Sequence, residues 1–139
     1  SYNMNTSVSF ELAKILKEKN FDVKVRGRIH VSHWHLVKDN IIPSNVNTYH
    51  TDMFAPINNW NSDIMHFMSL PTIAETVMWL YEKHSVWVEC YIDDNGTFGY
   101  LISKVTKEGR IDFPLKRRFI SPTEAYEAAI KYTLKNLTS

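Results

Sequence analysis

The chain has 139 residues, of which 44% are hydrophobic and 13% aromatic, so it can build one packed core and is too short for two ordinary domains. Its formal net charge of +1 gives no overall attraction to nucleic acid or to an anionic membrane, so such binding would need a local patch. A single cysteine, Cys90, excludes a framework of internal disulfides. We predict one domain over residues 1–139, in a reducing compartment such as the cytoplasm and without a membrane span.

The first segment with helical periodicity covers residues 9–19. Its apolar side chains recur three and four positions apart, and charged side chains fill most of the other positions. Ser7 or Ser9 can cap this helix. Asn20 follows it and tolerates the left-handed backbone that ends many helices.

The period changes to two after this helix. Apolar and polar residues alternate over residues 23–31, which is typical of a half-buried strand, and Gly27 predicts a bulge within it. The next region, residues 38–70, is rich in Asn and Ser and contains Pro43 and Pro56, so we predict an irregular segment. Because long loops are uncommon in compact domains, this segment is either functional or contains elements that the sequence conceals.

Regular patterns return after Leu70. Residues 71–84 predict a helix that begins with a proline. Its apolar face consists of Ile73, Val77, Leu80 and Tyr81. Alternating segments then flank the tripeptide Asp94-Asn95-Gly96, which is a strong hairpin signal.

The C-terminal part combines a turn, a strand and a helix. A second turn at residues 107–110 leads to a short strand over residues 115–120. The stretch SPTE then places Ser121 at a helix cap, Pro122 in the first turn and Glu124 at the closing position of a capping box. These features explain the stretch without a ligand.

The predicted order is helix, strand, irregular region, helix, hairpin, strand and helix. Strands and helices that are not strictly alternating are typical of an α+β domain. We predict a mainly antiparallel sheet of about three to five strands, covered on one face by about three helices.

Three stretches, FELAKILKEKNFD, PTIAETVMWLYEKHSVWVE and SPTEAYEAAIKYTLKNL, resemble small uncharacterised proteins encoded by bacterial phages and prophages. The resemblance covers the first helix and about the last half of the chain, and it transfers no catalytic residue. It implies a cytoplasmic accessory protein of the infected bacterial cell. Proteins of this kind commonly counter host defences or host regulation.

Two stretches combine basic side chains with aromatic rings. Their candidate ligand-binding residues are Arg26, Arg28, His33, Trp34 and His35 in the first stretch, and Lys116, Arg117 and Arg118 in the second. Guanidinium groups bind phosphate and flat rings stack on bases, so the two stretches would form an anion site if both face one groove. The structural alternative is a pair of solvated strand edges whose charge prevents aggregation.

The histidines support a different hypothesis. On a strand, His33 and His35 would share one face and could ligate a metal together with His50 or Asp52. Two side chains do not make a site, however, and the sequence lacks a glycine-rich phosphate loop, a nucleophile elbow and a metal-binding helix motif. We therefore predict no catalytic residues, no metal ligands and no cofactor.

The predicted hairpin carries Trp87, Tyr91, Phe98 and Tyr100. Cross-strand packing explains such aromatic residues in most sheets, whereas an exposed set would form a platform for a partner or for stacked bases. Exposure decides between the two.

We expect a non-catalytic protein that sequesters a small anionic or nucleotide ligand, or else a host protein. A homo-oligomer is expected if subunits share the site. The alternatives are a nucleic-acid-binding regulator that uses the same basic residues on a sheet, and a His-based metal hydrolase.

Overall fold

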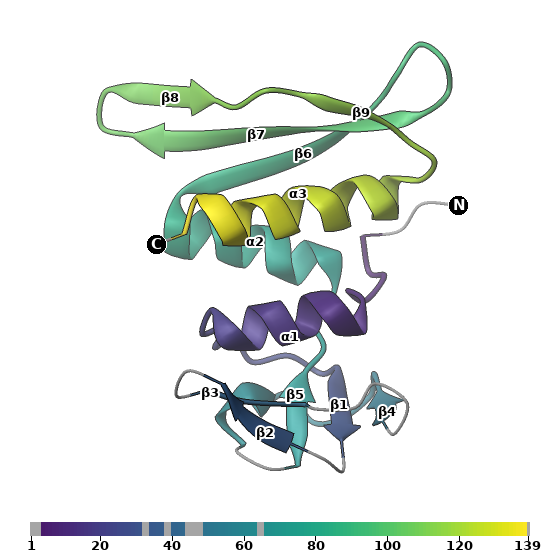
Figure 1. Cartoon of the computed structure of the whole chain (residues 1–139), viewed down its shortest axis with the longest axis vertical. Coiled ribbons are helices and arrows are strands. Elements are labelled where there is room, and N and C mark those ends of the chain that lie inside the picture. The colour runs from purple at the N-terminus through teal and green to yellow at the C-terminus, as the bar shows by residue number, and fades with distance from the viewer. Residues whose placement is uncertain (1–3, 32–33, 38–39, 44–48, 64–65, 139) are drawn as a thin grey trace. The chain divides into compact units, whose positions relative to one another are not determined.

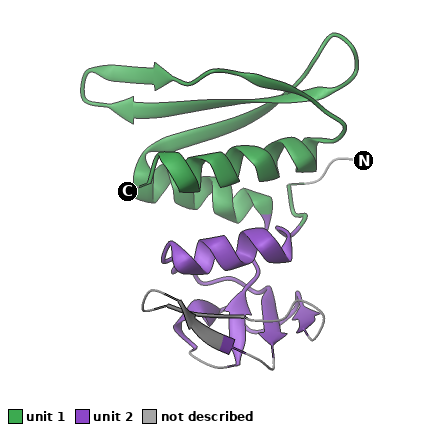
Figure 2. Ribbon diagram, viewed as in Figure 1, with its two compact units in different colours: residues 1–6, 73–139 green, residues 7–72 purple. Residues whose placement is uncertain are grey.

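The computed structural model describes residues 4–31, 34–37, 40–43, 49–63 and 66–138, and for residues 35–37 and 40–43 only the backbone. The helices are joined by antiparallel strands, which confirms the predicted α+β fold (Figure 1). The chain forms two compact units (Figure 2). Unit 1 consists of Ser1–Thr6 and Ile73–Ser139, and unit 2 consists of Ser7–Thr72.

Unit 2 contains one α-helix and two small sheets among its described residues. Its elements are α1 (Phe10–Glu18), β1 (Arg28–Val31), β2 (Trp34–Val37), β3 (Asn40–Pro43), β4 (Tyr49–Asp52), the 3-10 helix η2 (Trp60–Ser62) and β5 (Phe67–Ser69). The strands pair antiparallel, with β1 between β4 and β5, and with β2 against β3. The core is built from one face of α1 and the inward residues of β1 and β5, among them Leu12, Leu16, Ile29 and Met68.

Unit 1 is a four-stranded sheet with two helices on one face (Figure 1). Its elements are α2 (Ile73–His84), β6 (Val86–Ile92), β7 (Phe98–Thr106), β8 (Gly109–Asp112), β9 (Lys116–Phe119) and α3 (Pro122–Asn136). The strand β7 pairs with β6 on one side and with β8 and β9 on the other. Buried side chains of β6, β7 and α3 form the core, including Val88, Ile102, Ala129, Ile130 and Leu134.

Both predicted helix caps are present. In α1, the Ser9 hydroxyl accepts a hydrogen bond from the Leu12 backbone N–H at 3.1 Å, and Asn20 has the left-handed φ of 64°. In α3, the Ser121 hydroxyl accepts from the Glu124 N–H at 3.1 Å. These caps satisfy backbone donors that a helix start leaves without an intrahelical partner.

The strand predicted over residues 23–31 is shorter than expected. Only Arg28–Val31 pair as a ladder, and Val25 makes an isolated bridge to Asn58. Gly27 is not a bulge: its carbonyl accepts a hydrogen bond from the Leu70 N–H at 2.9 Å, and a Cβ there would collide with the Leu70 carbonyl oxygen. The glycine is therefore required by close contact between two backbone segments.

The segment predicted to be irregular, residues 38–70, contains β3, β4, η2 and β5. This corrects the prediction, and the strands also divide among separate sheets instead of one. The four residues of β4 are all exposed, so they show no apolar alternation. Their ladder depends on the backbone of β1, which the local sequence does not reveal.

Two further details in unit 1 differ from the predictions. Tyr81 is 44% exposed, and Trp79 is buried in its place on α2. A strand, β8, directly follows the turn that joins it to β7, where only a connection to the last strand was expected. Every residue of β8 is exposed, so the strand has no buried apolar face that its sequence could reveal.

None of the helices in the described ranges is sufficiently long and apolar to cross a bilayer.

Candidate ligand-binding site

The predicted site residues are divided between the two units. Unit 2 contains Arg26, Arg28 and Trp34, and unit 1 contains the range 116–118. His33 lies outside the described residues, as does the side chain of His35. The idea that both stretches face one groove therefore stays a prediction.

The outer face of the β4–β1–β5 sheet brings polar and aromatic side chains together. Alternation along β1 buries Ile29 and Val31 completely and leaves Arg28 and His30 on the opposite face. The register places Asp52 beside Arg28. It places His50 and Phe67 on either side of His30.

The Arg28 guanidinium lies against two aromatic rings. Its Cζ atom is 4.5 Å from the centroid of Trp60 and 4.2 Å from that of Phe67. The two rings are inclined by 62°, with centroids 5.2 Å apart, so they form a corner that receives the planar group. The Trp60 Nε1–H donates to the Val25 carbonyl at 3.1 Å, which fixes that wall. These contacts hold the cation in one position while its side chain remains 25% exposed.

Asp52 is the counter-ion of Arg28, but the pair is loose. The Arg28 Nη2 and Asp52 Oδ2 atoms are 3.6 Å apart, which is longer than a hydrogen bond. Asp52 Oδ1 accepts instead from the Phe54 backbone N–H at 2.9 Å. The Arg28 guanidinium has no hydrogen bond to any residue that the structure describes. Within the described part of the chain, no acceptor occupies these donors, so they can bind an outside acceptor. A guanidinium binds best to a two-pronged carboxylate or phosphate.

Histidines line the neighbourhood of Phe67. The His30 ring is 5.5 Å from the Phe67 ring, and the His66 ring is 6.4 Å from it. His66 lies beside Asp63, with 3.4 Å between Nδ1 and Oδ1. Flat, polar rings of this kind can stack on a planar ligand and donate hydrogen bonds to it.

The metal hypothesis gains no support from the part of the chain that is described. There, no three His, Cys, Asp or Glu side chains are placed to hold a metal ion. His50 and Asp52 lie on β4, beside His30 and Arg28 of β1. The remaining predicted ligands, His33 and the His35 side chain, are among those not described.

Trp34 has a structural role in unit 2. Its Nε1–H donates to the Val31 carbonyl at 2.7 Å, and the Lys17 Nζ lies 5.7 Å from the ring centroid. Burial lowers the pKa of Lys17, an effect that nearby Asp63 opposes. Trp34 is therefore packed and hydrogen-bonded.

Arg26, in contrast, is exposed at a bend and has no ion pair with a described residue.

The second basic stretch forms the strand β9. Its residues 116–118 are all exposed. The pairing with β7 is interrupted by a bulge, at which Arg118 adopts a left-handed φ of 71°. Among the described residues, Arg117 has one distant ion-pair partner, with 3.9 Å between its Nη1 and Asp93 Oδ1. This arrangement is typical of an edge strand protected by charge, and it leaves several cations open to solvent.

The aromatic residues of the hairpin do not form one platform. Cross-strand pairing puts Phe98 and Tyr100 on the face that carries the helices, and Tyr100 is only 5% exposed. Trp87 and Tyr91 point to the other face. The structural interpretation is therefore favoured for this hairpin.

Sequence reasoning identified Arg28 but not the groups that hold it. Trp60 and Phe67 come from the segment predicted to be irregular, and Asp52 was considered only as a metal ligand. The one local signal is the apolar run around Phe67, which becomes β5. Compared with protein-family models, curated proteins and solved structures, the chain gives no match.

Proposed function

We propose that the protein binds a small anion without transforming it, and that Arg28 is the anchoring group. The observation that carries the proposal is the environment of the Arg28 guanidinium. Two rings fix this group, and its N–H groups have no hydrogen-bonded partner among the described residues. Such a group has already lost its side-chain freedom, so binding costs less conformational entropy.

A phosphate-bearing nucleotide is the ligand class that fits best. The phosphate would accept hydrogen bonds from Arg28, and exposed His30 beside Phe67 offers a flat surface for a base. Exposed Arg26, two positions before Arg28, adds positive charge. Sequestration of a nucleotide in an infected bacterial cell agrees with the phage-type context that the sequence resemblance implies.

Calorimetric titration with adenosine monophosphate and with inorganic phosphate tests the proposal. The variant Arg28→Gln keeps much of the side-chain stem but removes the charge, and it should weaken binding at least about tenfold. Arg28→Ala is a poorer test, because it also removes packing against Trp60 and Phe67 and so lowers stability. Lys24→Gln removes an exposed cation outside the sheet and should leave affinity unchanged.

Two results would overturn the proposal. One is a failure of the wild-type protein to bind either probe. The other is equal affinity of Arg28→Gln and wild type in samples with the same circular dichroism spectrum. Native mass spectrometry of protein purified directly from cells should in addition reveal a bound small molecule that denaturation releases.

Nucleic-acid binding is the second candidate, because Lys116, Arg117 and Arg118 are three consecutive exposed cations. Binding through phosphates should weaken steeply with salt. A labelled single strand titrated at increasing salt distinguishes the candidates. Salt-independent binding, or binding unchanged by Arg118→Gln, would exclude this use of β9.

A further inference from the structure

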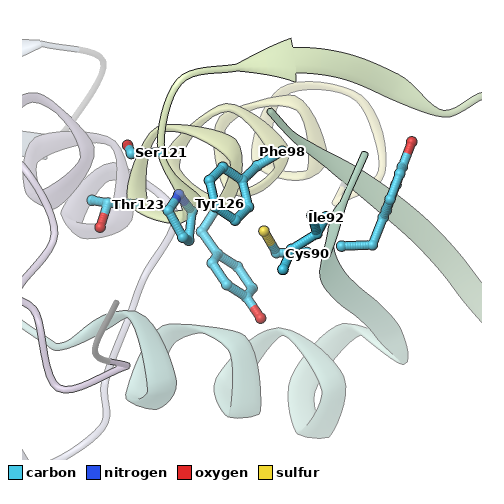
Figure 3. Close-up of a pocket in the computed structure, with 8 residues that line it drawn as sticks. Cys90, Ile92, Phe98, Ser121, Thr123 and Tyr126 are labelled. Atoms are coloured by element: carbon cyan, nitrogen blue, oxygen red, sulfur yellow. The ribbon is translucent and has the colours of Figure 1, made fainter. Parts of the chain in front are cut away.

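Unit 1 contains a cavity of about 570 Å³ that was not predicted from the sequence (Figure 3). It lies between the far ends of β6 and β7 and the beginning of α3. Side chains of Cys90, Phe98 and Tyr126 converge on it from these three elements. The cavity is partly open to solvent, and its size is within the range of small-molecule sites.

The sequence explains why the space exists. The helix-facing row of β6 runs Val86, Val88, Cys90, Ile92, and its first two members are fully buried. The small Cys90 side chain follows them and leaves room, while Ile92 is 73% exposed at the end of the strand. The side chain in this row is therefore smaller at Cys90, where the cavity begins. The last residue of the row, Ile92, is apolar but exposed.

The lining defines the chemistry of a ligand. Besides Cys90, Phe98 and Tyr126, it contains Pro122 and the hydroxyl-bearing Ser121 and Thr123, and none of the described lining residues is charged. A charged group placed against these residues would lose part of its hydration and gain no charged partner among them. Burial already raises the pKa of the Cys90 thiol, which shows how this environment disfavours charge. Phe98, Pro122 and Tyr126 provide flat apolar surfaces that suit a ring.

We infer that this cavity binds a small, uncharged molecule with an aromatic or other flat apolar ring. The inference is independent of the anion site at Arg28, because every lining residue belongs to unit 1. Ser121 and Thr123 at the start of α3 add polar groups to the lining. Ser121 uses its oxygen as an acceptor for the Glu124 N–H and still has a hydrogen to donate.

The experiment uses N-phenylnaphthylamine, a neutral two-ring dye whose fluorescence rises when it leaves water. The dye should bind the full-length protein saturably, with one dye molecule per protein chain. Its sulfonated analogue should bind at least about tenfold more weakly, because the sulfonate cannot be desolvated in the cavity. Cys90 is the only cysteine of the chain, so saturating dye should also slow its alkylation by iodoacetamide.

Variants localise the binding. Cys90→Phe fills the cavity and should abolish dye binding, whereas Cys90→Ser keeps the size of the side chain and should bind normally. Thr123→Phe fills the space from the opposite wall and replaces Cys90→Phe if that variant fails to fold. Arg28→Gln should bind the dye like wild type, which separates this inference from the anion proposal.

Three outcomes would overturn the inference. These are no saturable dye binding, dye binding that leaves the alkylation rate of Cys90 unchanged, and normal dye binding by a folded cavity-filling variant. Tighter binding of the sulfonated dye than of the neutral one would also contradict the assigned ligand class.

Discussion

At single positions, the presence or absence of a Cβ atom determines how closely two backbone segments can approach each other. At Gly27, a Cβ atom would collide with the carbonyl oxygen of Leu70 and would lie 2.9 Å from the Met53 Cε atom. The two segments are joined there by the hydrogen bond from the Leu70 N–H to the Gly27 carbonyl, so they cannot move apart without breaking it. Gly96 is different, because its φ of 77° is left-handed but a Cβ there would meet nothing within 4 Å.

We therefore expect Gly27→Ala to lower the free energy of unfolding by about 3 kcal/mol, in the upper range for overpacked sites. Gly96→Asn is the control and should cost less than about 1 kcal/mol, because Asn visits the left-handed region. Chemical denaturation of the three proteins measures both values. Equal destabilisation by the two substitutions would contradict the close contact at Gly27.

Among elements, those with local signals were predicted and those that depend on distant partners were not. The caps of α1 and α3 and the Asp94-Asn95-Gly96 turn are specified by neighbours in sequence, and all three are present. The strands β4 and β8 have only exposed side chains and are defined by hydrogen bonding to β1 and β7.

The candidate site follows the same rule. Arg28 was recognisable from its residue type, but the corner formed by Trp60 and Phe67 requires η2 and β5 to fold back beside β1. No local pattern encodes that contact. The cavity likewise could not be predicted, because its lining residues come from β6, β7 and α3 and meet only in the folded chain.

The cap of α3 gives a prediction at this scale. Ser121→Ala leaves the Glu124 N–H without its acceptor and should lower the free energy of unfolding by about 1 kcal/mol. Ser121→Asp supplies another acceptor and should keep most of the stability. Urea denaturation followed by circular dichroism compares the variants. If Ser121→Asp is as unstable as Ser121→Ala, the hydroxyl does not act as a cap.

At the scale of the whole molecule, unit 2 begins and ends at one place. Ser7 and Thr72 form an antiparallel bridge, and the Val8 N–H donates to the Pro71 carbonyl at 2.9 Å. Within unit 1, the Ile73 N–H donates to the Thr6 carbonyl at 2.9 Å, which ties the first residues of the chain to the start of α2. Unit 2 is therefore inserted into unit 1 through two adjacent connections.

A fragment of residues 7–72 should fold by itself, because its ends are already paired and its core includes fully buried Leu12, Leu16, Ile29 and Met68. A proton–nitrogen correlation spectrum should show dispersed signals. The same fragment with Leu16→Ala should lose about 2–5 kcal/mol of stability and serves as a control for a native core. A collapsed, poorly dispersed spectrum of the unchanged fragment would refute its independence.

The paired ends of unit 2 also bear on the order of folding. If unit 1 folded first, bringing Thr6 to Ile73 would close a loop made of all of unit 2, at an entropic cost on the order of 4 kcal/mol. Once unit 2 has folded, its bridged ends deliver Thr6 and Ile73 as near neighbours, and the long-range contact becomes in effect a local one. The insertion thus favours a folding order in which unit 2 forms first and brings together the two chain segments that make up unit 1.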